Sequence, residues 1–325
     1  MRKNLNTEHI EGRVYEHDLA LKVTGPNSKA PNTEYIGGSI KVAVDEECLN
    51  VITVKFTYVT ATNKNGSANK TFAALKKIID GGKTVVADGM DEAMKVKIDT
   101  AIALNDFYTD NDELVSVKEN NGGFNGGFVD IVTSLCDEAA RNTFKVDMLI
   151  TGVTRTEADP EKNIDKPFLT IRGAIFNFKN DLLPVDFRVD NPAGMKYFED
   201  LGVTNAEPIY TQVWGRINSL TSKVTVTEES AFGEASVRVV ERSVKNWTIT
   251  GAKPTPYDFG EENVLTVEEV TKAMQDRQTM LATKKAEREA YLAQKAANGG
   301  ASAFGAAPAS NATPSFSAPA GNFNF

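Results

Sequence analysis

Aromatic and arginine side chains alternate with aliphatic ones along three segments in the second half of the sequence. The segments lie at 168–178, 185–189 and 208–218. Successive side chains of an extended strand point to opposite sides, so each segment has one aliphatic face, which we expect to point into a β-sheet core. The opposite, outward face would carry Arg172, Phe176, Phe178, Arg188, Tyr210, Trp214 and Arg216.

This outward set has the chemistry needed to bind a single-stranded nucleic acid. Aromatic rings stack on bases, and guanidinium groups pair with phosphates in a fork geometry. Trp214 is expected beside Arg216 and near Arg172, on a strand whose Val213 and Ile217 face the interior. The alternative is that the same aromatic residues cover a barrel where a helix or the other half of the chain packs.

The first half of the sequence offers fewer candidates. Lys41, Lys55 and Lys97 would face outward without an aromatic neighbour and would contact phosphate alone. Phe56 and Tyr58 share the register of Ile52 and Val54, which favours the core.

A glycine-rich loop at 120–128 is the other candidate contact in this half. It contains Phe124 and Phe128, which could close over a bound strand because the glycines permit close backbone approach. The alternative is an ordinary long hairpin.

The order of the elements indicates an internal duplication. Residues 10–12 resemble 150–152, residues 36–40 resemble 171–175, and both halves contain K-x-F-x-x-L, at 70–75 and at 196–201. Leu104-Asn105 parallels Ile217-Asn218. A last match aligns Phe124, Val129, Ile131 and Val132 with Phe232, Val237, Val239 and Val240.

Each copy predicts three strands, a short helix and at least two further strands, which is the order of the OB-fold. The expected fold class is mainly β with short helices: two OB-like β-barrels in tandem, a long C-terminal helix and a disordered tail. The expected divisions are an N-terminal arm at 1–9, barrels at 10–140 and 141–260, the helix at 264–297 and the tail at 298–325.

The C-terminal region changes in composition. Thr266 and Glu269 form a capping box that begins a long helix, while Arg277, Lys284 and Arg288 interrupt its apolar stripe. We expect the helix to pack on a barrel and then to project into solvent. The tail has no charged side chain and is expected to be disordered when free. Residues Asp106, Asp110, Asp112 and Glu113 are interpreted as a solvated loop.

Composition excludes several classes of protein. The net charge of -8 argues against a protein that coats duplex DNA through a basic surface. Cys48 and Cys136 are far apart, and His9 and His17 lack metal-ligand spacing, so neither a disulfide framework, a metal site nor a cofactor is expected. P-loop, G-x-S-x-G and HExxH motifs are absent from the sequence, which favours a non-enzymatic protein. Without a secretory signal or an apolar span, a cytoplasmic location is expected, in the host cell if a phage encodes the chain.

The segment Trp214-Gly215-Arg216-Ile217, followed by Phe232-Gly233-Glu234, resembles a strand-loop element of phage-type single-stranded DNA-binding proteins. The duplicated barrels, the helix and the tail ending in Phe325 fit the same group. The resemblance implies a protein that coats and protects single-stranded DNA in replication, recombination or repair. It also implies that Phe325 and Phe323 recruit partner proteins, although this tail lacks the acidic residues of that family. The alternative is a phage structural or scaffolding protein with a duplicated barrel.

Overall fold

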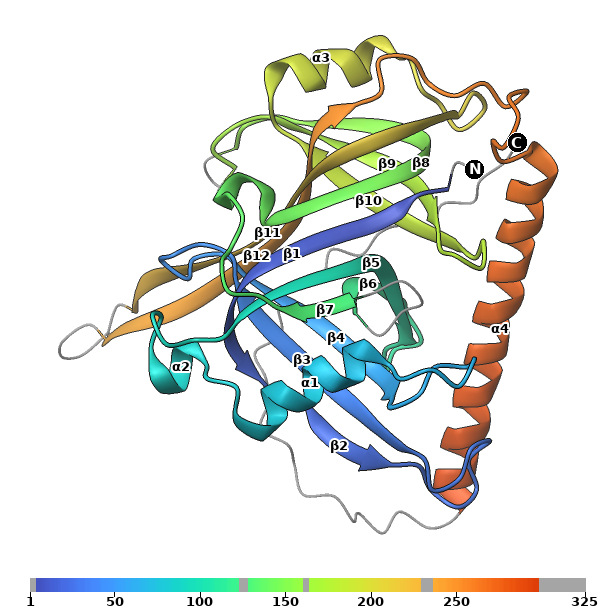
Figure 1. The fold of residues 1–325 in the computed structure, drawn as a ribbon. Coiled ribbons are helices and arrows are strands. Elements are labelled where there is room, and N and C mark those ends of the chain that lie inside the picture. Colours follow the sequence, from blue (N-terminus) through green and yellow to red (C-terminus); the bar gives the residue numbers. More distant parts are fainter. Residues whose placement is uncertain (1–3, 123–127, 160–163, 229–235, 298–325) are drawn as a thin grey trace.

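The computed structural model describes residues 4–122, 128–159, 164–228 and 236–297. Strands dominate both halves of the chain (Figure 1). The first half contains β1 (Asn6–His17), β2 (Ala20–Val23), β3 (Glu34–Ala43), β4 (Val51–Thr60), α1 (Lys70–Gly81), α2 (Val85–Asp88), β5 (Lys95–Tyr108), β6 (Leu114–Asn121) and β7 (Phe128–Ile131). The second half contains β8 (Asn142–Thr156), β9 (Phe168–Phe176), β10 (Leu182–Val189), α3 (Pro192–Asp200), β11 (Ile209–Glu228), β12 (Ser236–Ala252) and α4 (Val267–Ala297).

Strand pairing closes each half into a five-stranded ring. In barrel 1 the ring runs β1-β3-β4-β6-β5 and back to β1, and only β4 and β6 pair in parallel. In barrel 2 it runs β8-β9-β10-β12-β11 and back to β8, and only β10 and β12 are parallel. Both orders are those of the OB-fold, with a helix between the third and fourth strands. The predicted fold class is confirmed; the predicted tail at 298–325 lies outside the described residues.

The two barrels share one continuous sheet. Residues 6–10 of β1 pair in antiparallel fashion with residues 142–146 of β8, so the first strand of each barrel is hydrogen-bonded to the other. A single hydrophobic cluster runs through both barrels, from Ile10 and Ile40 to Phe187 and Trp247. Figure 1 shows barrel 2 above barrel 1, with the β11–β12 ribbon extending away from the ring.

The last of the repeat matches does not align equivalent strands. Val129 and Ile131 lie on β7, an extra strand paired to β5, whereas Val237 and Val239 lie on β12, the fifth strand of barrel 2. The fifth strand of barrel 1 is β6, so this match was wrong. Phe124 and Phe232 lie outside the described residues.

Helix α4 packs on a barrel as expected, but it crosses both barrels (Figure 1) and contacts barrel 1 as far as Arg288, so only its exposed end, residues 289–295, projects into solvent. Its first turns bury Val270 and Ala273 against barrel 2. Further along, Tyr108 donates a hydrogen bond to the carbonyl of Leu281, and Lys284 donates to the carbonyl of Asp106. The cationic residues that interrupt its apolar stripe therefore face barrel 1.

Acidic residues at the end of β5 and in the β5–β6 turn are partners of those cations. Asp106 is 7% exposed and accepts two hydrogen bonds from the Arg277 guanidinium, at 2.8 and 3.1 Å. Asp112 pairs with Arg288, which also donates to the carbonyl of Thr109 at 2.6 Å. The solvated-loop interpretation was therefore wrong for Asp106, which α4 covers, whereas Asp112 lies in an exposed turn as predicted and pairs with Arg288 at the surface.

Candidate nucleic-acid interface

An aromatic pair lies on the outer face of barrel 1, where the second strand begins and the third strand ends. The rings of Tyr35 on β3 and Tyr58 on β4 have centroids 4.7 Å apart. Tyr58 is 44% exposed, whereas Phe56 on the same strand is 1% exposed. The core prediction was therefore confirmed for Phe56 and wrong for Tyr58, and barrel 1 does carry outward aromatic residues.

A β-bulge explains why Tyr58 turns outward. The pairing of β3 with β4 shifts register between Ile36 and Gly38, so the alternation that buries Phe56 changes before Tyr58. Gly38 has φ +139°, and a Cβ there would lie 2.6 Å from the carbonyl oxygen of Asp18, so only glycine fits. The bulge thereby places an aromatic platform on a strand that otherwise faces the core.

A cation lies beside this pair. Lys22 on β2 stands opposite Tyr35, and its Nζ lies 3.6 Å from the position of a Cβ built on Gly37. The same position is 3.4 Å from the Tyr35 ring. A side chain at position 37 would therefore contact both the aromatic ring and the ammonium group.

Barrel 2 has a cation–aromatic pair at the corresponding place. Phe168 begins β9, and the Arg188 guanidinium near the end of β10 lies 4.0 Å from the centroid of its ring. Arg172 is exposed on β9 and stands opposite Asp186 of β10. The second and third strands of each barrel therefore carry one pair in contact, the tilted rings of Tyr35 and Tyr58 or the Phe168 ring with the Arg188 guanidinium over it, and we call these the two platforms.

Ion pairs involving β6 connect these faces. Lys118 donates to Asp186 Oδ1 across the barrel junction at 2.8 Å, and burial lowers the pKa of its ammonium group. The neighbouring Glu119 of β6 pairs with Lys55, and a separate ion pair joins Glu16 on β1 to Lys41 on β3. Lys41 and Lys55 are exposed as predicted, but a phosphate would have to compete with these carboxylates.

A second surface lies on the outer face of the shared sheet. An open groove of about 550 Å³ crosses β5, β1, β8 and β11, and Thr7, His9, Asp99, Thr143, Lys145 and Trp214 are among its lining residues. Trp214 is 38% exposed, and its indole lies against Gly251, where an added Cβ would come within 2.5 Å of Nε1. Lys145 Nζ lies 5.9 Å from the indole centroid.

Phe128, 55% exposed, stands opposite Asp99 on the neighbouring strand.

The groove floor contains a histidine between two carboxylates. His9 Nδ1 lies 2.7 Å from Asp99 Oδ1, and Nε2 lies 3.3 Å from Glu11 Oε2. The hydrogen bond to Asp99 raises the pKa of His9, and partial burial opposes it. Lys97, on the same strand as Asp99, is half-buried.

Several predicted binding residues have structural positions instead. Phe176 and Tyr210 are each 1% exposed because α4 and the segment before it cover this side of barrel 2, so their assignment as outward platforms was wrong. Arg216 donates to Asn142 Oδ1 at 2.8 Å and is half-buried. Phe178 is 48% exposed in the turn after β9, with Lys179 Nζ 5.7 Å from its ring centroid.

Trp214 and Arg172 do not lie together. Trp214 pairs with Lys145 of β8, whereas Arg172 pairs with Gly152. Seven residues of strand separate these positions, which is roughly 20 Å at the usual rise. The expected single surface is therefore divided into a platform on β9–β10 and a groove beside β11. Phe124, Phe323 and Phe325 lie outside the described residues.

Some interface residues were not among the sequence candidates: Lys22, Tyr35, Phe168, Lys118 and Lys145. The glycine pair Gly37-Gly38 inside a strand was the available signal for Tyr35 and Tyr58, because such glycines mark bulges. The position of Lys118 depends on contact between barrels, and no local pattern encodes it.

Two closed barrels of OB strand order, each with a platform on its second and third strands, define a tandem OB-fold protein. Residues 4–287 match the model of the YorF family, and the chain belongs to that family. No curated protein matches the sequence. Among the described residues, no helix is long and apolar enough to cross a membrane.

Two solved structures are similar at low identity. A deletion mutant of the single-stranded DNA-binding protein from Thermus aquaticus is 11% identical, with a TM-score of 0.43 over 80% of this chain and 98% of that one. A replication protein A heterotrimer bound to single-stranded DNA is 9% identical, with a TM-score of 0.23 over 87% of this chain and 70% of that one.

Proposed function

We propose that this protein binds single-stranded DNA without enzymatic activity and protects it during phage DNA replication, recombination or repair. The observation that supports this most is a ring pair at the same place in both barrels, the tilted aromatic pair Tyr35–Tyr58 and the cation–aromatic pair Phe168–Arg188. The second and third strands form the face with which OB-folds bind oligonucleotides, and base stacking on aromatic rings is tolerant of sequence.

The charge distribution favours stacking over phosphate pairing as the main source of affinity. The chain carries a net charge of -8, and Lys41 and Lys55 are already paired with carboxylates. Among the described residues, Lys22, Arg172, Arg188 and Lys145 are cations that lie beside the platforms or the groove. Each phosphate contact in single-stranded DNA contributes about -0.7 to the slope of log K against log salt. Four such contacts correspond to a slope of about -2.8, which is modest.

We expect removal of one platform to weaken binding of oligo-dT without unfolding the protein. Tyr58→Ala and Phe168→Ala should each cost about 1 to 3 kcal/mol of binding free energy, because each removes a stacking surface. Arg188→Ala should also lower the salt slope by about 0.7 for one lost phosphate contact. Fluorescence anisotropy of a labelled oligonucleotide at several salt concentrations measures both quantities.

Tyr291→Ala is the matched control, because Tyr291 is 63% exposed on α4 and belongs to neither platform. It should bind like the unaltered protein. Equal losses for Tyr291→Ala and Tyr58→Ala, or unchanged binding in both platform variants, would show that DNA does not use these faces.

The groove gives a separate expectation for the two tryptophans of the chain. Trp247 is 4% exposed and donates to Glu8, whereas Trp214 is 38% exposed beside Lys145. Oligo-dT should therefore quench the fluorescence of Trp214 and not that of Trp247. Trp214→Ala should abolish the quenching and weaken binding by about 1 to 3 kcal/mol, with little change in the salt slope. Quenching that survives in Trp214→Ala would exclude the groove as a contact.

The other candidate function is a phage structural or scaffolding protein, for which the exposed aromatic residues would be subunit contacts. Absence of oligonucleotide binding combined with association with phage particles would support it. For the DNA-binding function, we propose that Phe323 and Phe325 contact replication or recombination proteins.

A further inference from the structure

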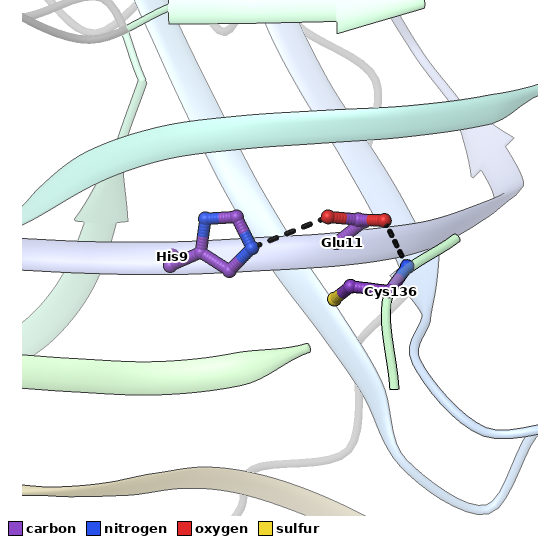
Figure 2. A group of neighbouring side chains, drawn as sticks. All are labelled: His9, Glu11 and Cys136. Carbon is purple, nitrogen blue, oxygen red and sulfur yellow. Dashed lines mark hydrogen bonds and ion pairs between the residues drawn. The ribbon is translucent and has the colours of Figure 1, made fainter. Parts of the chain in front are cut away.

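One group of side chains outside the platforms has the composition of a metal site. His9 and Glu11 lie two residues apart on the same face of β1, and Cys136 lies in the segment between β7 and β8. One donor atom of each residue lies within 4.8 Å of the other two. Figure 2 shows the three side chains gathered beside β1. Imidazole nitrogen, carboxylate oxygen and thiolate sulfur are the donors that Zn²⁺ takes in proteins.

The histidine is already oriented as a metal ligand would be. Its Nδ1 is hydrogen-bonded to Asp99 Oδ1 at 2.7 Å, which leaves Nε2 facing Glu11 Oε2 at 3.3 Å. Metal-bound histidines almost always bond a carboxylate, carbonyl or water through their other ring nitrogen. Asp99 therefore fixes which nitrogen faces Glu11.

Glu11 and the cysteine segment are held in place by bonds that require no ion. The Cys136 backbone N–H donates to Glu11 Oε1 at 2.5 Å, which leaves Oε2 on the side of His9. Arg141 Nε donates to the carbonyl of Cys136 at 2.8 Å, and the Glu11 N–H donates to the carbonyl of Arg141 at 2.7 Å. The site is thus built from β1 and from a segment fastened to it.

The separations suit a tetrahedral ion after a small adjustment. Bonds of about 2.0 to 2.3 Å to zinc place neighbouring ligand atoms roughly 3.3 to 3.7 Å apart. The 3.3 Å between His9 Nε2 and Glu11 Oε2 already falls in that range. The thiol must approach by about 1 Å at most, and rotation about its Cα–Cβ bond supplies this because Cys136 is only half-buried.

We propose that His9 Nε2, Glu11 Oε2 and Cys136 Sγ bind one Zn²⁺ ion, with the fourth position open to water. The thiol loses its proton to solvent as the ion binds. The ion fastens the segment between the barrels to β1, next to residues 6–10 that pair with β8. Sequence spacing hides this site because Cys136 is 125 residues from Glu11.

Co²⁺ is a suitable probe because it takes the place of zinc and reports its ligands by absorption. Untagged, reduced, full-length protein is titrated with Co²⁺ after chelator treatment. We expect one ion per chain, visible bands of a four-coordinate ion, a near-ultraviolet thiolate-to-cobalt band, and displacement by Zn²⁺. Cys136→Ser should remove the thiolate band and weaken binding by more than about tenfold, and Asp99→Asn should weaken it by about 10- to 100-fold.

Cys48→Ser is the matched control, because Cys48 is the other cysteine of the chain and is also half-buried. It should retain the band and the affinity. Circular dichroism of each variant establishes that it is folded. Absence of Co²⁺ binding, binding without a thiolate band, or a band that survives in Cys136→Ser and is lost in Cys48→Ser would overturn the proposal.

Discussion

Asp106→Asn should lower the free energy of unfolding by about 3 to 5 kcal/mol. The side chains of Asp106 and Arg277 are 4% and 9% exposed, and the carboxylate also accepts a hydrogen bond from Ser116 at 2.5 Å. The substitution leaves the Arg277 guanidinium buried without a counter-charge, and breaking a buried pair in this way is strongly destabilising. Urea denaturation followed by circular dichroism measures the change.

Asp112→Asn is the matched control for this prediction. Asp112 pairs with Arg288 on the same helix, but its side chain is 58% exposed, so the loss should stay below about 1 kcal/mol. Asparagine also tolerates the left-handed backbone of this position, where φ is +60°. Replacing both partners by apolar residues, as Asp106→Leu with Arg277→Met, should recover much of the lost stability. Equal effects of the two asparagine variants would show that the buried pair does not fasten α4.

Glu8→Gln should make the protein more stable at alkaline pH. Glu8 is 2% exposed at the junction of the barrels, and one of its oxygens accepts a hydrogen bond from Trp247 Nε1 at 2.9 Å. Burial raises the pKa of this carboxyl to about 8. The protonated form is therefore favoured in the folded state, and glutamine reproduces it without a charge.

The direction with pH follows from that raised pKa. The stability that neutral Glu8 contributes is complete below its ordinary pKa of 4.5 and is lost as the pH rises through about 8. At about 1.4 kcal/mol for each pKa unit, the loss reaches at most about 5 kcal/mol. His9 also has a raised pKa and acts in the same direction, so the quantity to measure is the difference between the unaltered protein and Glu8→Gln.

Unfolding free energies between pH 5 and pH 9, with a chelator present, measure this difference. Glu16→Gln, which changes a half-buried carboxylate on the same strand, should follow the profile of the unaltered protein. If the difference between Glu8→Gln and the unaltered protein stays constant across this range, Glu8 is ionised in the folded state and the prediction is wrong.

The alternation of side chains predicted the strand order and many inward positions, because a period of two is imposed by the backbone itself. It placed Ile171, Val213 and Ile217 in the core and Trp214 outside, and the structure agrees. It failed at Tyr58, because β4 has one extra residue between Phe56 and Val59, opposite the stretch from Ile36 to Gly38, and this bulge changes the alternation. A one-residue shift reverses every later position on a strand, so an unrecognised bulge gives an error of this kind.

The same alternation of side chains could not predict contacts between segments that are distant in the sequence. The outward faces of Phe176 and Tyr210 were correctly assigned, but alternation does not show what packs on an outward face, and α4 covers both. Likewise, Arg277 was noticed as a charge that interrupts an apolar stripe, but Asp106 was interpreted as part of a solvated loop. Their pairing joins residues 171 positions apart, and a single sequence contains no periodic signal for it.

The pairing of β1 with β8, together with α4 across both barrels, has a consequence for ligands that reach both platforms. Barrels joined by a flexible linker lose conformational entropy when one ligand binds both. Here the shared sheet and helix α4 already hold the two barrels in a fixed relative position. Once a ligand contacts one platform, the second platform is therefore present at a high effective concentration, because no flexible linker lowers it. Affinity should therefore rise abruptly at one threshold length of oligonucleotide, the length that spans from Tyr58 to Phe168, and only gradually beyond it.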